Sequence, residues 1–98
     1  MSQYVPQRFK PSPRRMPVHA NVRAEVWERD RGICRYCDFP GEVLDHVVPY
    51  RYSRSNEPDN LVVACARCNG LGGRHVFASL EEKRDFILAK RRTDFLAQ

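Results

Sequence analysis

Two pairs of cysteines give the chain its clearest chemical pattern. Cys34 and Cys37 form one C-x-x-C pair, and Cys65 and Cys68 form the second. Each pair can present two thiolates to one tetrahedral Zn²⁺ at about 2.3 Å, and four cysteine ligands leave no position for a substrate, so a structural zinc site is predicted. The rival interpretation is a thiol redox motif, but one C-x-x-C would suffice for that, and neither pair lies in an evident βαβ pattern.

The long insert between the cysteine pairs, residues 38–64, has the pattern of two strands. The segment 42–48, EVLDHVV, is rich in β-branched residues and ends at Pro49, and NLVVA leads as a second strand into Cys65. A polar loop joins the two strands. A short helix is expected after the second strand and should end in the glycine-rich stretch 70–73. The predicted unit is β-β-α, with zinc at its base.

Four polar residues fall at particular places of this unit. Asp45 and His46 are neighbours on the first strand. Asn60 stands where the loop meets the second strand, and Asn69 directly follows the last cysteine. In this combination the chain resembles the HNH endonuclease family, whose ββα-metal motif has an Asp-His or His-His pair, a central Asn, and a final His or Asn after a zinc-binding Cys. The matching text is DHVVP, DNL and CARCN, within roughly residues 27–75.

The resemblance implies a role for each of the four residues. His46 is expected to be the general base, since imidazole, with an ordinary pKa of about 6.5, can accept a proton from water. Asp45 and Asn69 offer oxygen ligands that suit a catalytic Mg²⁺, Mn²⁺ or another divalent ion. Asn60 cannot change charge, so its amide is expected to brace the loop or the imidazole. The implied reaction is hydrolysis of DNA phosphodiester bonds, leaving 5′-phosphate and 3′-hydroxyl ends.

One position departs from the family pattern. Many members carry Lys three residues after the final His or Asn, and this chain has Gly72 there. Either that basic group is absent, or Arg74 replaces it from a different backbone position. In the loop between the strands, Arg51 and Arg54 are expected to face DNA, with an ordinary solvated loop as the alternative. The other arginines expected to bind nucleic acid are Arg14 and Arg15.

Helices are expected on both sides of the β-β-α unit. The first is predicted over about residues 20–30 and should end at Gly32, and the second begins at Ser79-x-x-Glu82, a capping-box pattern. The residues predicted to face the core are Val22, Val26 and Trp27 in the first helix and Leu80, Ile87, Leu88 and Phe95 in the second. The basic residues of the second helix are interpreted as a solvated face, with DNA contact as the alternative: Lys83, Arg84, Lys90, Arg91 and Arg92.

Composition and charge restrict what else the chain can be. Its 98 residues suffice for one small domain, assigned to residues 19–98. Residues 1–18 are rich in proline and basic residues, which favours an extended basic arm along a phosphate backbone, with a disordered tail as the alternative. The net charge of +5 suggests a polyanionic partner. Without an apolar run of membrane-spanning length or a signal-peptide pattern, no membrane partner and a cytoplasmic, bacterial or phage-like setting are expected.

The sequence therefore predicts an α+β protein, a small ββα-metal (His-Me finger) domain with a structural zinc, flanked by an N-terminal and a C-terminal helix. Its predicted function is that of a divalent-metal-dependent HNH endonuclease with DNA as partner. A monomer is favoured, and small proteins of this family often act beside larger DNA-processing machinery. The alternative from another class is a nonenzymatic zinc module that binds nucleic acid, and such a module should tolerate loss of His46.

Overall fold

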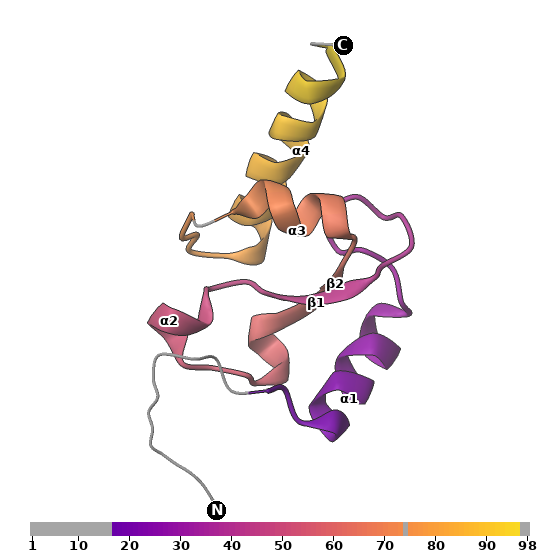
Figure 1. Cartoon of the computed structure of the whole chain (residues 1–98), viewed down its shortest axis with the longest axis vertical. Helices are drawn as coiled ribbons and strands as arrows, with labels where there is room; N and C mark the ends of the chain where they lie inside the picture. Colours follow the sequence, from indigo (N-terminus) through magenta and orange to yellow (C-terminus); the bar gives the residue numbers. More distant parts are fainter. Residues whose placement is uncertain (1–16, 74, 97–98) are drawn as a thin grey trace, which may run out of the picture.

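The computed structural model describes residues 17–73 and 75–96 of the chain. The elements in chain order are α1 (Ala20–Asp30), β1 (Val43–His46), α2 (Tyr50–Ser53), the 3₁₀ helix η2 (Pro58–Asn60), β2 (Leu61–Ala64), α3 (Ala66–Gly72) and α4 (Leu80–Leu96). Figure 1 shows the two strands at the centre, α1 below them, and α3 and α4 above them. The predicted arm lies almost wholly outside the described residues.

The two strands and α3 form the predicted ββα unit. β1 and β2 pair antiparallel, with Asp45 opposite Val62 and His46 opposite Leu61. α3 follows β2 after a single residue, and α1 and α4 flank the unit on opposite sides (Figure 1). The fold is therefore α+β, a small ββα-metal domain between an N-terminal and a C-terminal helix, as the sequence predicts.

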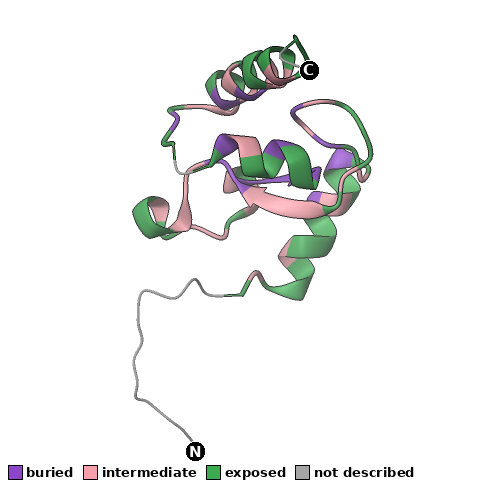
Figure 2. Ribbon diagram, turned by 45° about the horizontal axis from the view of Figure 1, so that its top comes forward, coloured by how far each residue is buried: buried purple, intermediate pink, exposed green. Residues whose placement is uncertain are grey.

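β2 is the buried centre of the domain because side chains cover both of its faces. All four of its residues are buried, as the purple strand in Figure 2 shows. Successive strand residues point to opposite faces. Leu61 and Val63 therefore pack with Val26 of α1, whereas Val62 and Ala64 pack in a larger cluster with the cysteines, α3 and α4. The same strand thus anchors both flanking helices.

α1 confirms the first predicted helix and its ending. It spans Ala20–Asp30, and His19 caps it, since the imidazole Nδ1 accepts a hydrogen bond from the backbone N–H of Asn21 at 3.1 Å. After the helix the chain turns through a left-handed conformation that glycine adopts without strain, with φ of +67° at Gly32. Trp27 is partly buried against the cluster on this face of β2.

Asp30, the last residue of α1, ties this helix to β2. Its side chain is 1% exposed and accepts hydrogen bonds from Arg29, Arg35 and the backbone N–H of Val63. Burial, the largest single cause, acts to raise the pKa of this carboxyl, but the hydrogen bonds from Arg29 and the other two donors outweigh it and hold the pKa below its ordinary value. Arg29 also donates to the backbone carbonyl of Leu61 at 2.6 Å. The ionised carboxylate therefore fixes α1 against the sheet.

The connection between the strands is more ordered than the sequence predicts. An irregular polar loop is expected there, whereas the structure has one turn of helix, α2, followed by the 3₁₀ turn η2. The turn of α2 begins after Pro49, whose carbonyl accepts hydrogen bonds from the N–H groups of Tyr52 and Ser53, each at 3.0 Å. Pro58 begins η2, where its missing N–H costs nothing because the first residues of a helix have no intrahelical partner for it.

α4 includes all the residues predicted for the second helix, through Phe95, and projects beyond the rest of the domain (Figure 1). Ser79 caps it as the capping-box pattern predicts, because Ser79 Oγ accepts a hydrogen bond from the N–H of Glu82 at 3.1 Å. Ile87 is fully buried, as predicted. Phe95, predicted to lie on the same buried side, is instead 74% exposed, because the last turns of the helix extend past α3.

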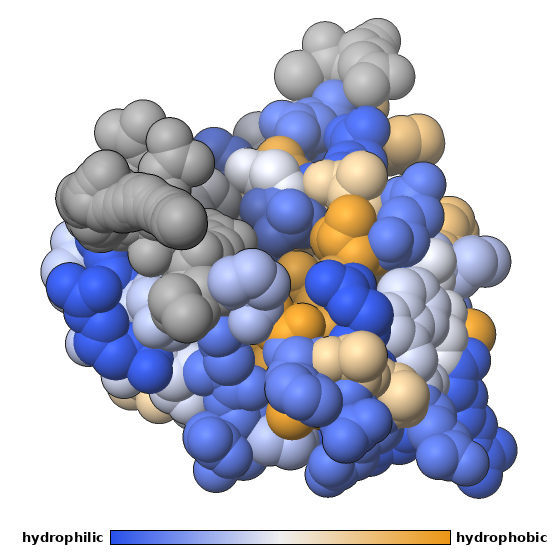
Figure 3. Space-filling view, turned by 60° about the horizontal axis from the view of Figure 1, so that its bottom comes forward, coloured by the Kyte–Doolittle hydropathy of each residue, from blue (hydrophilic) through white to orange (hydrophobic). Residues whose placement is uncertain are grey.

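The face of the domain that includes the α1 end is mainly hydrophilic (Figure 3). Figure 3 views the molecule from the α1 end and shows polar side chains over most of this face, with apolar side chains gathered near its centre. No helix within residues 17–73 and 75–96 is both long and apolar enough to cross a membrane.

Candidate active site and metal centre

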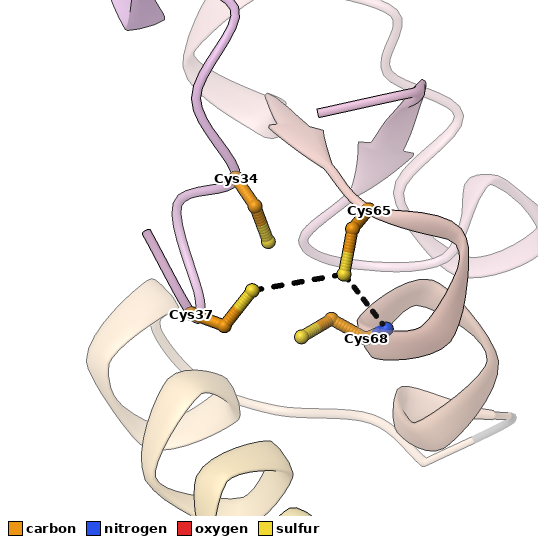
Figure 4. Close-up of side chains that lie close together, drawn as sticks. All are labelled: Cys34, Cys37, Cys65 and Cys68. Atoms are coloured by element: carbon orange, nitrogen blue, oxygen red, sulfur yellow. Dashed lines mark hydrogen bonds between the residues drawn. The ribbon is translucent and has the colours of Figure 1, made fainter. Parts of the chain in front are cut away.

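Four cysteine thiols converge between α3, α4 and the turn that follows α1. Cys34 and Cys37 come from that turn, and Cys65 and Cys68 come from the start of α3, with all four side chains directed toward a common centre (Figure 4). Their Sγ atoms lie within 4.8 Å of one another, and those of Cys37 and Cys65 are 3.7 Å apart. Zinc–sulfur bonds of about 2.3 Å in a tetrahedron place two sulfurs about 3.8 Å apart. The cluster therefore fits one structural Zn²⁺.

The thiols need a cation to be ionised together. Burial, the largest cause, raises the pKa of the Cys68 thiol, and the neighbouring thiols of Cys65 and Cys37 raise it further. Burial also acts to raise the pKa of Cys65, but hydrogen bonds from the Cys68 backbone N–H at 3.4 Å and from the neighbouring thiols outweigh it and lower that pKa. A divalent ion supplies the positive charge that four thiolates require. Arg91 of α4 adds a donor to Cys68 Sγ at 3.6 Å.

Asp45 lies on β1, and one oxygen of its carboxylate accepts two hydrogen bonds. The Tyr36 hydroxyl donates to Asp45 Oδ2 at 2.6 Å, and Lys83 Nζ donates to the same oxygen at 2.8 Å. Burial, followed by the charge of Asp45, raises the pKa of Tyr36 far above its ordinary value, so the phenol stays a donor. Within residues 17–73 and 75–96 the other oxygen, Oδ1, makes no hydrogen bond and is available to a ligand.

His46 is the last residue of β1, and its ring is buried. Nε2 lies 2.7 Å from Asn56 Oδ1, and Tyr50 meets the ring edge-on with the two ring centroids 5.9 Å apart. Because an amide oxygen can only accept, this contact places the imidazole proton on Nε2 and leaves the electron pair on Nδ1. The strand ends here, as the adjacency of Asp45 and His46 requires if two side chains on opposite faces are to reach one site.

Three of the four predicted catalytic residues line one pocket. This pocket has a volume of about 250 Å³, and its lining includes Asp45, His46, Asn69 and Lys83. Asn69 is exposed on α3, and its side-chain amide has no hydrogen bond to any other described residue, so its oxygen can accept a cation. Carboxylate and amide oxygens are the ligand types that Mg²⁺ and Mn²⁺ prefer. The donor set of the pocket therefore fits a divalent ion that also keeps water or phosphate oxygens as ligands.

The segment that carries both sites matches the model of a known family. The match is to the HNH endonuclease family and covers residues 34–74. The matched segment contains all four clustered cysteines and the four residues of the motif, Asp45, His46, Asn60 and Asn69. No curated protein matches the chain. HNH domains are generally nucleases that act on DNA, so the match supports a nuclease-type or nucleic-acid-binding function.

Asn60 of the HNH domain does not line the pocket and instead braces the connection between the strands. Its Oδ1 accepts a hydrogen bond from the N–H of Val48 at 2.9 Å. Its Nδ2 lies 3.1 Å from Val48 O, 3.2 Å from Ser53 Oγ and 3.0 Å from Ser55 O. Of the two contacts expected for this amide, the structure has the one to the loop, and Asn56 makes the contact to the imidazole.

The arginines expected to bind nucleic acid fall into two groups. Arg51 and Arg54 are exposed at α2, and each guanidinium lies near an aromatic ring, 5.8 Å from the centroid of Tyr52 and 5.9 Å from that of Tyr50 respectively. Tyr50 also contacts His46, so this basic surface adjoins the pocket of the HNH domain. The other arginines lie outside the described residues: Arg14, Arg15 and Arg74.

Sequence reasoning missed two residues that hold the site. Asn56 stands in a polar loop, where no pattern distinguishes it from its neighbours. Lys83, predicted to be solvated, is 4% exposed and bonds to Asp45. A signal for Lys83 was present, because Leu80, Lys83 and Ile87 recur at the helical spacing of an apolar stripe, which places this lysine on the buried side of α4.

Proposed function

We propose that the protein is a DNA endonuclease that hydrolyses phosphodiester bonds with the help of a divalent ion. The observation that carries this proposal is the shared pocket of His46, Asp45 and Asn69 within an HNH domain. A divalent ion such as Mg²⁺ or Mn²⁺, when bound there, supplies Lewis-acid stabilisation of the charge that develops on the phosphate. The zinc ion at the cysteines has a structural role, because four protein ligands close its coordination shell.

His46 acts as the general base. The Nε2–H group donates to Asn56, so Nδ1 is free to take the proton of the attacking water. This hydrogen bond also fixes the ring in one orientation. Asp45 Oδ1 and Asn69 Oδ1 are the protein ligands of the divalent ion. Tyr36 and Lys83 hold Asp45 by its other oxygen, which fixes the orientation of the carboxylate. Asn60 touches none of the reacting atoms and stabilises the loop that carries Asn56.

DNA is the substrate that the family and the charge of the chain support together. The net charge is +5, and the exposed Arg51 and Arg54 adjoin the pocket. Arginines of this kind bind phosphates without reading sequence, so they position a strand over the pocket. The products are expected to carry 5′-phosphate and 3′-hydroxyl ends.

A nonenzymatic nucleic-acid-binding module is the second candidate, and the burial of His46 favours it. The residue is 7% exposed, whereas a general base must reach a water molecule. In such a module the Asp45–Lys83 ion pair and the His46–Asn56 contact would serve the fold alone. The two candidates differ in what happens when the imidazole is removed.

A supercoiled-plasmid assay separates the candidates. Wild type should cleave with added Mg²⁺ or Mn²⁺, and His46→Ala should cleave roughly 10²- to 10⁴-fold more slowly with DNA binding retained. Asp45→Ala and Asn69→Ala should regain part of their lost activity at high divalent-ion concentration, because they weaken binding of the ion. His75→Ala is the matched control, since His75 is exposed and contacts Phe77 and Phe86 instead of the pocket.

Two outcomes would overturn the assignment. If wild type binds DNA yet cleaves neither duplex nor single strand with Mg²⁺, Mn²⁺, Ni²⁺ or Co²⁺, the protein is a binding module. If His46→Ala cleaves as fast as wild type, the base has been assigned wrongly. A loss of activity in His75→Ala but not in His46→Ala would transfer the role to the other histidine.

A further inference from the structure

Lys83 belongs to the active-site pocket although it lies outside the segment that matches the HNH family. Its side chain is 5% exposed, and Nζ donates to Asp45 Oδ2 and to the backbone carbonyl of His46, both at 2.8 Å. It lines the same pocket as Asp45, His46 and Asn69. The pocket is thus built from β1, α3 and the C-terminal helix α4, with an ammonium group beside the expected divalent-ion ligand.

Gly72 explains how α4 comes close enough to deliver this lysine. A Cβ atom at Gly72 would lie 3.0 Å from Lys83 Cε and 3.5 Å from Ile87 Cδ1. The first distance is shorter than nine in ten contacts that Cβ atoms make in proteins. The space beside α3 that a side chain at position 72 would fill is therefore occupied by the lysine of α4. The basic group that the sequence lacks at position 72 reaches the site from another helix.

The charges in the pocket cancel before any ion or substrate binds. Among the described lining residues only Asp45 and Lys83 carry formal charge, one negative and one positive. Their contact is nearly dry, with 11% and 5% of the side chains exposed, so water screens it little. A divalent ion on Asp45 Oδ1 and Asn69 Oδ1 would bind beside a carboxylate whose charge the ammonium group of Lys83 already balances. Cations bind weakly where the net ligand charge is zero, so this site alone should bind the ion weakly.

A DNA phosphate supplies the negative charge that this site lacks. It can ligate the divalent ion, which then has two anionic ligands against one ammonium group. The same phosphate gains from the presence of the ion, because linkage between two binding sites is reciprocal. The phosphate can also accept a hydrogen bond from Lys83 Nζ, which lies in the same pocket and would then move away from Asp45. This shift weakens the repulsion between the ammonium group and the ion, so Lys83 contributes to the coupling.

We infer that Lys83 is a positioning residue that makes the divalent-ion site of this domain depend on DNA, so that ion and phosphate bind cooperatively. This inference rests on the proposed function for the identity of the pocket. A lysine that only fastens α4 to β1 would change stability when replaced, but it would leave the coupling between ion and DNA unaltered. The coupling is therefore the quantity to measure.

The test uses full-length, zinc-loaded protein in a His46→Ala background, so that the DNA stays intact. Free Mn²⁺ is followed by its EPR signal in titrations with and without a short duplex, and the duplex alone gives the background. We expect Mn²⁺ to bind the protein–DNA complex at least about tenfold more tightly than the free protein, within the usual range of coupling between sites. Lys83→Met should bind Mn²⁺ more tightly without DNA and should lose part of this difference, because the direct attraction between ion and phosphate remains.

Tyr36→Phe is the matched control, because it removes the other hydrogen bond to Asp45 Oδ2 without changing any charge. Its coupling factor should stay within about twofold of that of the parent, since the net ligand charge is the same. Equal Mn²⁺ affinity with and without DNA in the parent protein would overturn the inference, and so would an unchanged coupling factor in Lys83→Met. If Lys83→Met does not fold, equal affinities in the parent would still overturn the inference.

Failure of this inference is distinguishable from failure of the proposed function. A wild type that cleaves plasmid but shows no coupling retains its nuclease assignment and loses only the role given to Lys83. If Mn²⁺ binds neither the free protein nor the complex and wild type does not cleave, both are overturned together.

Discussion

Replacing Asn60 by alanine should lower the free energy of unfolding, because its side-chain amide holds the connection between the strands together. Asn60 makes four contacts to the connection between the strands. Its Nδ2 carries only two hydrogens, so the three contacts on that atom share two donors, and Oδ1 accepts one further hydrogen bond. The amide therefore contributes the equivalent of about three hydrogen bonds.

The expected loss in the free energy of unfolding follows from the hydrogen bonds that Asn60→Ala removes. At about 0.5–1.5 kcal/mol net for each hydrogen bond, three contribute about 1.5–4.5 kcal/mol. The lower half of that range applies because Asn60 is half-buried and because the Val48 carbonyl keeps a hydrogen bond from Ser53 Oγ at 3.2 Å. The Val48 N–H has no second partner among the described residues. We expect the free energy of unfolding to fall by about 2–3 kcal/mol.

Urea denaturation with Trp27 fluorescence as the signal, at a fixed excess of zinc, measures this change. For a domain of this size the free energy falls by about 1–2 kcal/mol for each molar of urea, so the midpoint should fall by roughly 1–3 M. Asn69→Ala is the matched control, because it is the same chemical change at an exposed amide without side-chain hydrogen bonds in the described part of the chain. Its stability should stay within about 0.5 kcal/mol of wild type.

Cleavage measurements on the same two variants complete the test. Asn69→Ala should lose activity with its stability unchanged, whereas activity lost by Asn60→Ala should return in part at low temperature or without denaturant, where the variant is folded. An Asn60→Ala protein with the midpoint of wild type and no cleavage would place this amide in the chemistry and refute the structural role argued for it.

Three further predictions follow from the metal centre, the Asp30 ion pairs and the basic arm. Elemental analysis should find one zinc per chain, with roughly 10 kcal/mol or more of apparent binding free energy, and a folded zinc-free protein with a disulfide at Cys34 would contradict this. Asp30→Asn should lower the free energy of unfolding at neutral pH by about 2–3 kcal/mol, because it removes a buried carboxylate from two arginines that water can partly reach. The folded-state pKa of Asp30 is below its ordinary value of 3.8. The difference in free energy of unfolding between wild type and Asp30→Asn should therefore be full above that pH and shrink below it. A difference that persists unchanged in acid would count against the ion pairs. Deleting residues 1–15 should weaken binding about equally for all DNA sequences and flatten its salt dependence, and an unchanged salt slope would leave the arm without a role.

The sequence predicted those parts of the fold that depend on local patterns. The spacing within each C-x-x-C pair predicts a metal site directly, because two cysteines three positions apart can bind one ion. The β-branched runs before Pro49 and before Cys65 are likewise sufficient to place two strands, although the first strand ends at His46, ahead of Val47 and Val48. The capping of α4 by Ser79 depends on residues only three positions apart.

The contacts that complete the pocket depend on non-local packing and were not predicted. Whether Lys83 reaches Asp45 is decided by how closely α4 approaches α3, and that approach depends on the missing side chain of Gly72. Asn56 and Asn60 are amides of one polar connection, and which of them meets the imidazole is decided by the path of the backbone through α2 and η2. Neither the backbone path through α2 and η2 nor the approach of α4 to α3 can be predicted from the spacing of residue types.

The position of α4 in the chain also determines when the domain can be completed during synthesis. A ribosome makes the cysteines, both strands and α3 before it makes Lys83 and Arg91, so the nascent ββα unit can collect its zinc while the C-terminal helix does not yet exist. Until α4 docks, Asp45 lacks the ammonium group of Lys83, and Cys68 Sγ lacks the guanidinium group of Arg91. Both sites are therefore completed last, when α4 brings Lys83 and Arg91 to them and Ile87 to the core beside the cysteines.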